Sequence, residues 1–142
     1  MNQRALSRAI RTTFMQLKRN AQKKYTATKM PIHPQDAHFM EQLELNPGMS
    51  PQDLANKNDI DKAYITRRVR ELEQQGFISR SPNPDDQRRI RLTLTEAGTE
   101  MMTKGLTLME ESEAMVFGKL TEPELLTLYG LLTKCVCDKN KK

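Results

Sequence analysis

Cationic and hydrogen-bonding side chains are concentrated on one short stretch of this sequence. Few carboxylates lie near them before Glu71 and Glu73. Such side chains suit the major groove of DNA, where the base edges present hydrogen-bond acceptors and donors. On an isolated helix the same residues are usually only a solvated surface. The members of this group are Lys62, Tyr64, Thr66, Arg67 and Arg70.

A short helix is predicted from Ser50 onward. Ser50 can cap this helix, because Asp53 follows three residues later in the pattern of a capping box. Leu54 and Ala55 form its apolar side. Residues 56–59 (Asn-Lys-Asn-Asp) predict a turn that ends the helix, since their side chains compete with the helical backbone for hydrogen bonds.

A second helix follows the turn and carries the cationic group. Asp61 is predicted to cap it, and Gly76 to end it after about Gln75. Two helices joined in this way form a helix-turn-helix, whose second helix normally enters the major groove. Nucleic-acid contact is therefore the favoured interpretation of its outward face. The apolar residues predicted to face inward are Ile65, Val69 and Leu72.

A β-hairpin is predicted after the second helix. Its first strand starts at Phe77 and Ile78, and residues 89–94 alternate between polar and apolar in a second strand. Residues 81–88 contain two prolines and predict a stiff loop at the tip. Met49 is expected to form a very short strand beside the hairpin. The residues predicted to face the core from the second strand are Ile90, Leu92 and Leu94.

Arginine side chains follow the predicted hairpin tip. Arg88 can enter a minor groove, where negative potential favours a guanidinium, and Asp86 can pair with Arg88 and fix its direction. The alternative is an ordinary surface hairpin with a weak, exposed ion pair. The candidates for phosphate contacts are Arg70, Arg80 and Arg89.

A dense set of residues across this region follows a recognisable pattern. Its members are Thr66-Arg67, Leu72-Glu73, Gly76-Phe77-Ile78, Arg80, Asp86-Gln87-Arg88 and Leu94-Thr95-Glu96-Ala97-Gly98. The pattern resembles the winged helix of MarR-family transcriptional regulators. This resemblance implies a homodimeric bacterial regulator with recognition helices in successive major grooves. Arg68 departs from the family pattern, which more often has an apolar residue there; its side chain could reach solvent or contact a phosphate.

The resemblance also implies a small-molecule effector near the junction between dimerisation and DNA-binding parts. The residues assigned to such a ligand are Met30, His33, His38 and Met40. Core packing is the more frequent role of methionine. The histidines could instead occupy a hinge, and metal binding is disfavoured because no cysteine or carboxylate set accompanies them.

Long helices are predicted on both sides of the winged helix. Residues 2–28 form one helix with eight Lys or Arg and no Asp or Glu in residues 1–30. These cations could contact phosphate, pair with acidic helices elsewhere in the protein, or be solvated; the last two interpretations together are favoured. Thr95 is predicted to cap another helix, and Thr121 with Glu124 a last one.

The whole chain fits a single soluble domain of 142 residues with a net charge of +5. The predicted fold is mostly α with a small β-wing. Residues 34–98 form a winged helix-turn-helix DNA-binding lobe, and residues 1–30 and 99–142 form an N- and C-terminal helical dimerisation layer. The absence of a long apolar run and of a signal peptide predicts a cytoplasmic protein with no membrane partner.

Catalytic chemistry is not expected. The sequence has no glycine-rich phosphate loop and no recognisable set of nucleophile and base, so an enzyme and a cofactor are both disfavoured. Cys135 and Cys137 diverge on a predicted helix, and buried thiols are favoured over a redox switch.

Two hypotheses for the function remain. The first is a homodimeric, sequence-specific transcriptional regulator on an inverted-repeat operator in double-stranded DNA, a repressor relieved by a small-molecule ligand. The second is a winged-helix protein-interaction module that binds an acidic protein, which the arginine at the wing tip disfavours.

Overall fold

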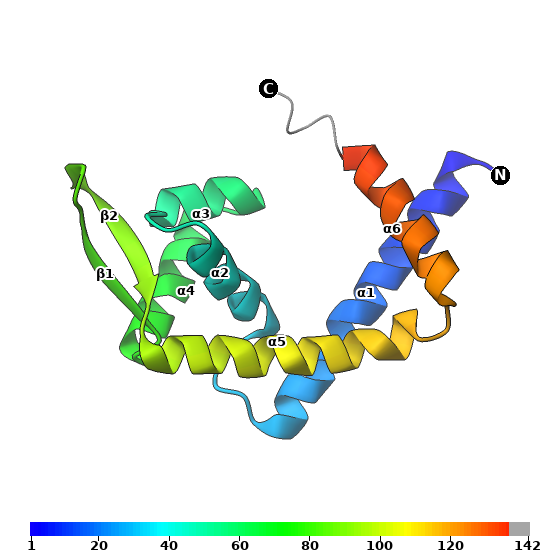
Figure 1. The fold of residues 1–142 in the computed structure, drawn as a ribbon, viewed down its shortest axis with the longest axis horizontal. Coiled ribbons are helices and arrows are strands. Elements are labelled where there is room, and N and C mark those ends of the chain that lie inside the picture. The colour runs from blue at the N-terminus through cyan, green and yellow to red at the C-terminus, as the bar shows by residue number, and fades with distance from the viewer. Residues whose placement is uncertain (137–142) are drawn as a thin grey trace. The chain divides into compact units, whose positions relative to one another are not determined.

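The computed structural model describes residues 1–136 and is mostly helical with one small β-ribbon (Figure 1). This confirms the predicted fold class. Two compact units are present, one formed by residues 21–109 and the other by residues 1–20 together with the described residues from 110 onward. The elements in chain order are α1 (Gln3–Thr28), α2 (Pro34–Leu45), α3 (Pro51–Asn58), α4 (Lys62–Gln74), β1 (Ile78–Asn83), β2 (Asp86–Leu94), α5 (Glu96–Phe117) and α6 (Glu122–Val136).

The core of the unit 21–109 lies where α2, α3 and α4 pack against the base of the ribbon. Every residue predicted to face inward from α3 and α4 is buried, with 2% exposure or less: Leu54, Ala55, Ile65, Val69 and Leu72. Helix α2 contributes Ala37, Phe39, Met40 and Leu43, each 3% exposed or less. The periodicity of the apolar residues therefore predicted the inward faces correctly.

Helix α3 is longer than predicted. It continues through Asn58, so the turn expected at 56–59 is wrong; the chain turns at Asp59, which has a left-handed φ of 51°. Asn58 remains in the helix because its side-chain amide is held by Gln42 of α2 and by the carbonyl one turn earlier in α3. The Asn58 and Gln42 amides exchange two hydrogen bonds of 2.7 and 3.0 Å, and Asn58 Nδ2 also donates to the Leu54 carbonyl at 2.7 Å. This amide pair ties α3 to α2.

The ribbon is also longer than predicted. Its strands extend to Asn83 and resume at Asp86, so the loop predicted at 81–88 is wrong and only residues 84 and 85 form the turn. Pro82 is tolerated because a two-stranded ribbon has free edges, where a missing N–H breaks no ladder bond. Ile90 is 39% exposed, not buried, since the outer ribbon extends past the core, whereas Leu92 is 1% exposed.

The base of the ribbon is joined to its neighbours by a few hydrogen bonds. Met49 does not form the predicted strand, but its carbonyl accepts the Leu92 N–H at 2.8 Å. Thr95 caps α5 as predicted. Its hydroxyl accepts the Gly98 N–H at 3.0 Å and donates to the Gly76 carbonyl at 2.6 Å. One hydroxyl thus links the end of α4 to the start of α5.

The second unit contains residues 1–20, of which 3–20 belong to α1, together with residues 110–117 of α5 and helix α6. No residue of α6 is buried in the single chain, and the predicted cap is present, because the Thr121 N–H donates to Glu124 Oε1 at 2.9 Å. Cys135 is exposed, so the expectation of a buried thiol is wrong for it; Cys137 lies outside the described residues. The large apolar side chains exposed here are Leu6, Ile10, Phe14, Met15, Met115, Leu126, Tyr129, Leu131, Leu132 and Val136.

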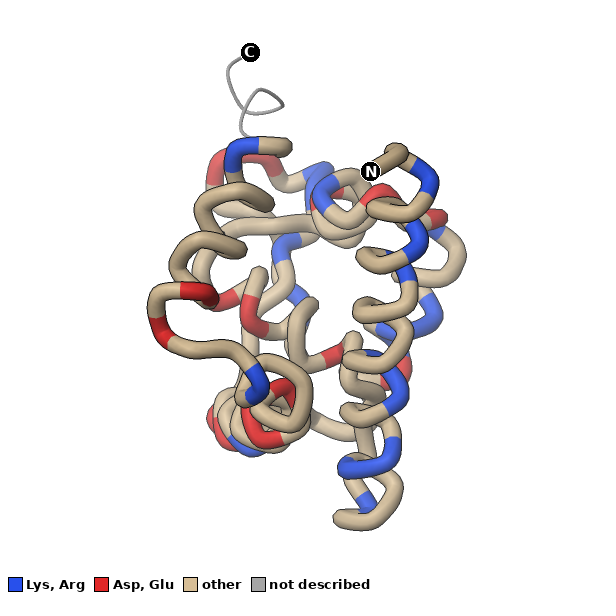
Figure 2. The backbone as a smooth tube through the Cα atoms, turned by 90° about the vertical axis from the view of Figure 1, so that its right-hand side faces the viewer, with Lys and Arg blue, Asp and Glu red and all other residues tan. Residues whose placement is uncertain are grey.

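Lysine and arginine residues recur along α1 (Figure 2). Lys18 Nζ lies 5.5 Å from the centre of the Phe14 ring, a cation–π contact within the helix. Among the described residues, no carboxylate pairs with Arg4, Arg8, Arg11 or Arg19. These four arginines are exposed in the single chain.

The Tyr25 hydroxyl is a buried polar group in the unit 21–109. Tyr25 is 2% exposed, and its oxygen has no hydrogen-bond partner among the described residues. The site is tight, because a Cβ added to Gly105 would lie 2.6 Å from that oxygen. Burial, and secondarily the negative charge of Asp36, raises the pKa of Tyr25 to about 12.

Tyr25→Phe is expected to stabilise the protein by about 1 kcal/mol at neutral pH, because a buried, unpaired hydroxyl costs desolvation free energy. The raised pKa favours the neutral phenol in the folded state. The unfolded chain therefore loses the phenol proton before the folded protein does. The stability of the wild-type protein falls as the pH rises from about 10 to about 12, and the advantage of the phenylalanine variant grows over that range. Urea denaturation at pH 7 and pH 11 measures both effects. A variant that is no more stable than the wild type at pH 7 would contradict the burial of an unpaired hydroxyl.

Candidate nucleic-acid interface

Helix α4 ends at backbone hydrogen bonds that close its last turn. The Phe77 N–H donates to the Leu72 carbonyl at 2.9 Å, and the Gly76 N–H to the Glu73 carbonyl at 3.0 Å. These bonds form a Schellman motif, which requires a left-handed residue; Gly76 has a φ of 83°. At the other end Asp61 occupies the N-cap position but makes no side-chain capping bond. The predicted helix is present and starts after Asp61, whose carbonyl accepts the Ile65 N–H at 3.2 Å, but the capping bond expected from the Asp61 side chain is absent.

The outward face of α4 carries the predicted group. Lys62, Arg67 and Arg70 are exposed, and Tyr64 and Thr66 are half-buried. The Arg67 guanidinium lies 5.8 Å from the centre of the Tyr64 ring, while the Tyr64 hydroxyl lies 3.4 Å from Gln35 Oε1. Among the described residues no carboxylate pairs with Lys62 or Arg70. The face therefore offers two unpaired cations, with Arg67 oriented beside an aromatic ring.

Arg68 faces the interior of the unit, which sequence reasoning missed. Its Nε donates to Asp36 Oδ1 at 3.0 Å and a terminal nitrogen to Asp36 Oδ2 at 2.7 Å. The Arg68 and Asp36 side chains are only 13% and 1% exposed. Neither solvent exposure nor a phosphate contact, the two roles considered from the sequence, fits this geometry. Arg68 lies at a half-inward position of an amphipathic helix. A charged residue at such a position indicates a buried partner, and this was the signal in the sequence.

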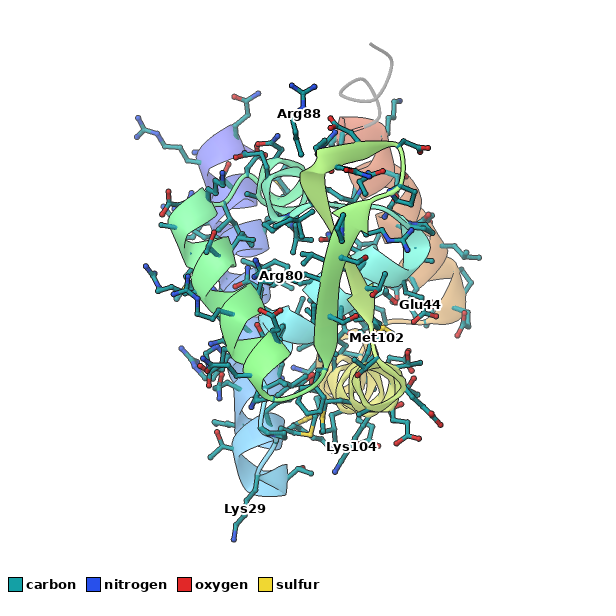
Figure 3. All side chains as sticks on the ribbon, turned by 90° about the vertical axis from the view of Figure 1, so that its left-hand side faces the viewer. Lys29, Glu44, Arg80, Arg88, Met102 and Lys104 are labelled. Atoms are coloured by element: carbon teal, nitrogen blue, oxygen red, sulfur yellow. The ribbon has the colours of Figure 1, made fainter. Side chains whose placement is uncertain are left out.

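Arg88 projects from the ribbon near its tip (Figure 3). Its side chain is 94% exposed, and its Nε lies 3.5 Å from Asp86 Oδ1, which also accepts the Arg88 N–H at 3.1 Å. The predicted pairing of Asp86 with Arg88 is present. Because both groups are exposed, the pair orients the arginine without contributing much to stability.

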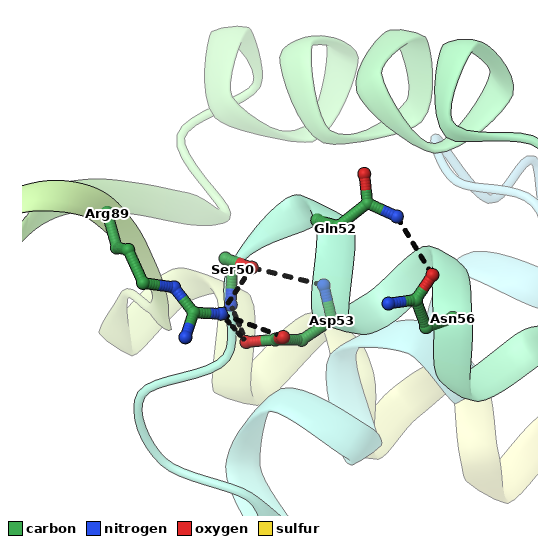
Figure 4. A network of polar contacts seen from close by, with 5 residues as sticks. All are labelled: Ser50, Gln52, Asp53, Asn56 and Arg89. Carbon is green, nitrogen blue, oxygen red and sulfur yellow. Dashed lines mark hydrogen bonds and ion pairs between the residues drawn. The ribbon is translucent and has the colours of Figure 1, made fainter.

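The other two arginines proposed for phosphate are engaged by carboxylates. Arg80 Nε donates to Glu73 Oε2 at 3.1 Å, which ties β1 to α4. Arg89 donates from one nitrogen to both Asp53 oxygens at 2.8 Å and lies 3.4 Å from the Ser50 hydroxyl (Figure 4). Arg89 thereby connects the wing to the start of α3. A phosphate role for either arginine stays a prediction, and it would require sharing the guanidinium with a carboxylate.

Asp53 also completes the predicted capping box of α3. Its carboxylate accepts the Ser50 N–H, and the Ser50 hydroxyl accepts the Asp53 N–H, both at 3.0 Å. The hydrogen bond from the Ser50 backbone, followed by smaller contributions from the Ser50 hydroxyl and Arg89, lowers the pKa of Asp53.

Asp53→Ala is expected to destabilise the protein by about 1 kcal/mol at pH 7, because it removes one side of the capping box and releases Arg89. The lowered pKa means that this contribution is present above about pH 4 and is lost as the pH falls through the folded pKa. Urea denaturation at pH 7 and pH 3 tests both statements. Gln52→Ala is the matched control, since among the described residues the Gln52 side chain bonds only to Asn56, on the same helix.

The residues predicted to contact an effector do not share one environment. His33 and His38 are exposed, Met30 is half-buried against the core, and Met40 is fully buried in it. Effector binding by these residues stays a prediction, with Met40 available only to a ligand that enters the core. Among residues 1–136, no group of three or more His, Cys, Asp or Glu is placed to hold a metal ion. No helix in the same part of the chain is long and apolar enough to cross a membrane.

Comparisons with known proteins agree on one family. The MarR family model matches residues 32–90. The HTH-type transcriptional regulator BilQ of Clostridium symbiosum is 35% identical, over 68% of this chain and 67% of its own. The uncharacterised HTH-type transcriptional regulator YdcH of Bacillus subtilis is 37% identical over 50% of this chain. The chain spans about half of the length of two of these relatives: 48% of YdcH and 54% of a transcriptional regulatory protein from Thauera aromatica.

Solved structures share the fold. The apo form of MarR from Escherichia coli superposes with a TM-score of 0.79 at 23% identity, covering 92% of this chain and 96% of its own. A mutant of the same protein complexed with operator DNA gives 0.80 at 22% identity, with 93% and 94% covered. A MarR transcriptional regulator from Methanosarcina mazei gives 0.83 at 19% identity, with 98% and 99% covered.

Proposed function

The chain belongs to the MarR family of DNA-binding transcriptional regulators, and from this premise we propose that it acts as a homodimer on an inverted-repeat operator, repressing transcription until a small molecule binds. MarR-family proteins are regulators and not enzymes. A repressor of this kind would act on DNA in the cytoplasm.

The observation that carries the proposal is the exposed cationic face of α4 together with the exposed Arg88. Both lie in the winged helix, the part of the chain that the family model matches. We assign base contacts in the major groove to Lys62, Tyr64, Thr66 and Arg67, and a minor-groove contact to Arg88, oriented by Asp86. Phosphate contacts fall to Arg70, Arg80 and Arg89.

A homodimer is supported by the apolar side chains exposed in the second unit. Leu126 and Tyr129 are each 70% exposed, and several more of α1 and α6 exceed 40%. A water-exposed apolar face of this kind marks an interaction surface. Sedimentation equilibrium should give twice the mass of the chain, whereas the mass of one chain at micromolar concentration would contradict the dimer.

Relief by a small molecule would act through the separation of the two recognition helices. That separation must stay near one helical turn of DNA, about 34 Å, for both helices to reach their half-sites. A ligand that favours a different separation therefore weakens operator binding. Met30, His33, His38 and Met40 are the residues that we assign to contacts with it.

Selection from a randomised double-stranded DNA pool at two salt concentrations tests the function. Enrichment of an inverted repeat, with half-site centres about ten base pairs apart, is the expected result. Weak, salt-sensitive binding without a common motif would contradict it and favour a module that holds an acidic protein. Lys62→Ala and Thr66→Ala should alter the selected bases; a uniform loss of affinity would make these side chains phosphate contacts.

Arg88→Ala is expected to weaken binding to the selected operator by about tenfold or more, the size of one good groove contact. The melting temperature should be nearly unchanged, because the Arg88 side chain is almost fully exposed. Fluorescence anisotropy and thermal denaturation measure the two quantities. Gln87→Ala, at the neighbouring exposed position of the wing, serves as the control. A melting temperature lowered as much as the affinity would make Arg88 structural.

A further inference from the structure

The ion pair between Arg68 and Asp36 joins α4 to the first turn of α2 at two points. Each of two Arg68 nitrogens meets a different Asp36 oxygen, at 3.0 and 2.7 Å. Asp36 Oδ2 also accepts the His33 N–H at 2.8 Å, which fixes the carboxylate in place. A bidentate pair constrains direction as well as distance, because both bonds are satisfied in only one orientation of the planar guanidinium.

Stability alone does not explain this pair. Removing two charges from water costs about as much free energy as their attraction returns, and well-packed apolar residues often stabilise a protein equally well. Adjacent α4 positions show that apolar contacts are available, since Ile65, Val69 and Leu72 already pack in the core. What an apolar contact lacks is direction, because dispersion and burial tolerate small rotations that a bidentate pair does not.

The position of Arg68 makes the orientation of α4 important for DNA recognition. Arg68 follows Arg67 directly and lies on the same helix as Lys62 and Thr66, the residues assigned to bases. A rotation of α4 by about 10° would move side-chain atoms on its surface, about 6 Å from the axis, by about 1 Å. Recognition sites need their groups held within about 0.5 Å. A constraint on rotation is thus a constraint on which bases are read.

We infer that Arg68 and Asp36 are positioning residues that set the rotation of α4 about its axis, and thereby determine the base preference of Lys62, Thr66 and Arg67. The inference rests on the proposed DNA-binding function. Arg68 itself contacts no base, because its side chain is turned inward onto Asp36.

The test compares the wild-type protein with a double variant, Asp36→Leu with Arg68→Met. The double variant removes one positive and one negative charge, so the net charge and the salt dependence of DNA binding should not change. Apolar replacement of both partners should keep the melting temperature within about 5 °C. Discrimination between the selected operator and operators with one base pair changed should fall about tenfold, while binding to unrelated DNA stays the same.

Arg68→Lys supplies the intermediate case. Lysine keeps the charge and the ion pair but offers a single point of contact in place of a fork, so discrimination should fall by less than in the double variant. If the double variant does not fold, Arg68→Lys still tests the inference. Undiminished discrimination in either folded variant would overturn the inference.

A second measurement does not depend on DNA. Residual dipolar couplings of the backbone amides in α2 and α4 report the relative orientation of these two helices. We expect the orientation of α4 to change or to become less ordered in the double variant; an unchanged orientation would overturn the inference. A wild-type protein that selects no DNA motif would instead overturn the proposed function, and the couplings would still decide whether the ion pair sets the rotation of α4.

Discussion

Gly98→Ala is expected to destabilise the protein by about 3 kcal/mol, at the upper end of the cost of overpacking. Gly98 is buried in the first turn of α5, and an added Cβ would overlap the Phe77 carbonyl oxygen and lie 2.9 Å from its carbon. The obstacle is backbone, so no side-chain rotation relieves it. Phe77 is itself held by its N–H bond to Leu72 and by the Thr95 N–H at its carbonyl.

Urea denaturation followed by circular dichroism measures this cost. Gly130→Ala is the control, because a Cβ added at Gly130 meets no atom within 4 Å and alanine favours the helical backbone. We expect the control to be neutral or slightly stabilising. If the two alanine variants had equal stability, the close approach of α5 to Phe77 would be wrong.

Breaking the buried ion pair on one side should cost more than any other single substitution considered. Arg68→Met leaves the Asp36 carboxylate buried without its cation, and Asp36→Asn leaves the Arg68 guanidinium without its anion. Removing one partner of a buried pair typically costs about 3–5 kcal/mol. Replacing both partners by apolar residues should cost far less than the sum of the two single substitutions.

Chemical denaturation at 10 °C measures these differences. The low temperature is chosen to keep the variants folded, because a loss of about 3–5 kcal/mol is a large part of the stability of a small domain. Arg80→Met is the matched control. Arg80 forms a comparable contact with Glu73, but both side chains are about one third exposed, so its loss should cost less than about 1 kcal/mol. Equal costs for Arg68→Met and Arg80→Met would show that the interior pair is better solvated than its burial indicates.

Local patterns in the sequence were sufficient for most of the helical fold. The spacing of Ile65, Val69 and Leu72 predicted the inward face of α4, and Gly76 its end, because helical periodicity and the left-handed C-terminal residue are properties of the chain itself. Ser50 and Thr95 were likewise recognisable as caps. Each of these features depends only on neighbours a few residues away.

The wing was predicted less well because its features are not local. Prolines and Asn or Asp residues indicate a loop by propensity, yet in 81–88 they lie mainly in strands of an isolated ribbon. Alternation identified the face that carries Ile90 and Leu92. It did not show how far the core extends along that face, which is set by helices distant in sequence.

The partners of charged residues were the hardest features to predict. Arg68 and Asp36 are 32 residues apart, and Arg89 and Asp53 are 36 apart. An arginine at either position is compatible with DNA contact, solvent or a carboxylate, and only the folded chain selects among these. For Arg89 the structure adds Asp53 as a partner beside the predicted phosphate role. For Arg68 the buried contact with Asp36 replaces both solvent exposure and a phosphate contact.

The Thr95 hydroxyl has a consequence for how the protein opens locally. The Thr95 hydroxyl donates to the Gly76 carbonyl while it caps Gly98, and the Thr95 N–H donates to the Phe77 carbonyl, so the end of α4 cannot separate from the start of α5 without breaking its contacts with Thr95. The amides of Phe77, Thr95 and Gly98 should therefore exchange with deuterium at one common rate, as a single cooperative unit. The amide of Asp85, in the turn at the ribbon tip, should exchange much faster and independently, so that the wing changes shape while its base stays closed.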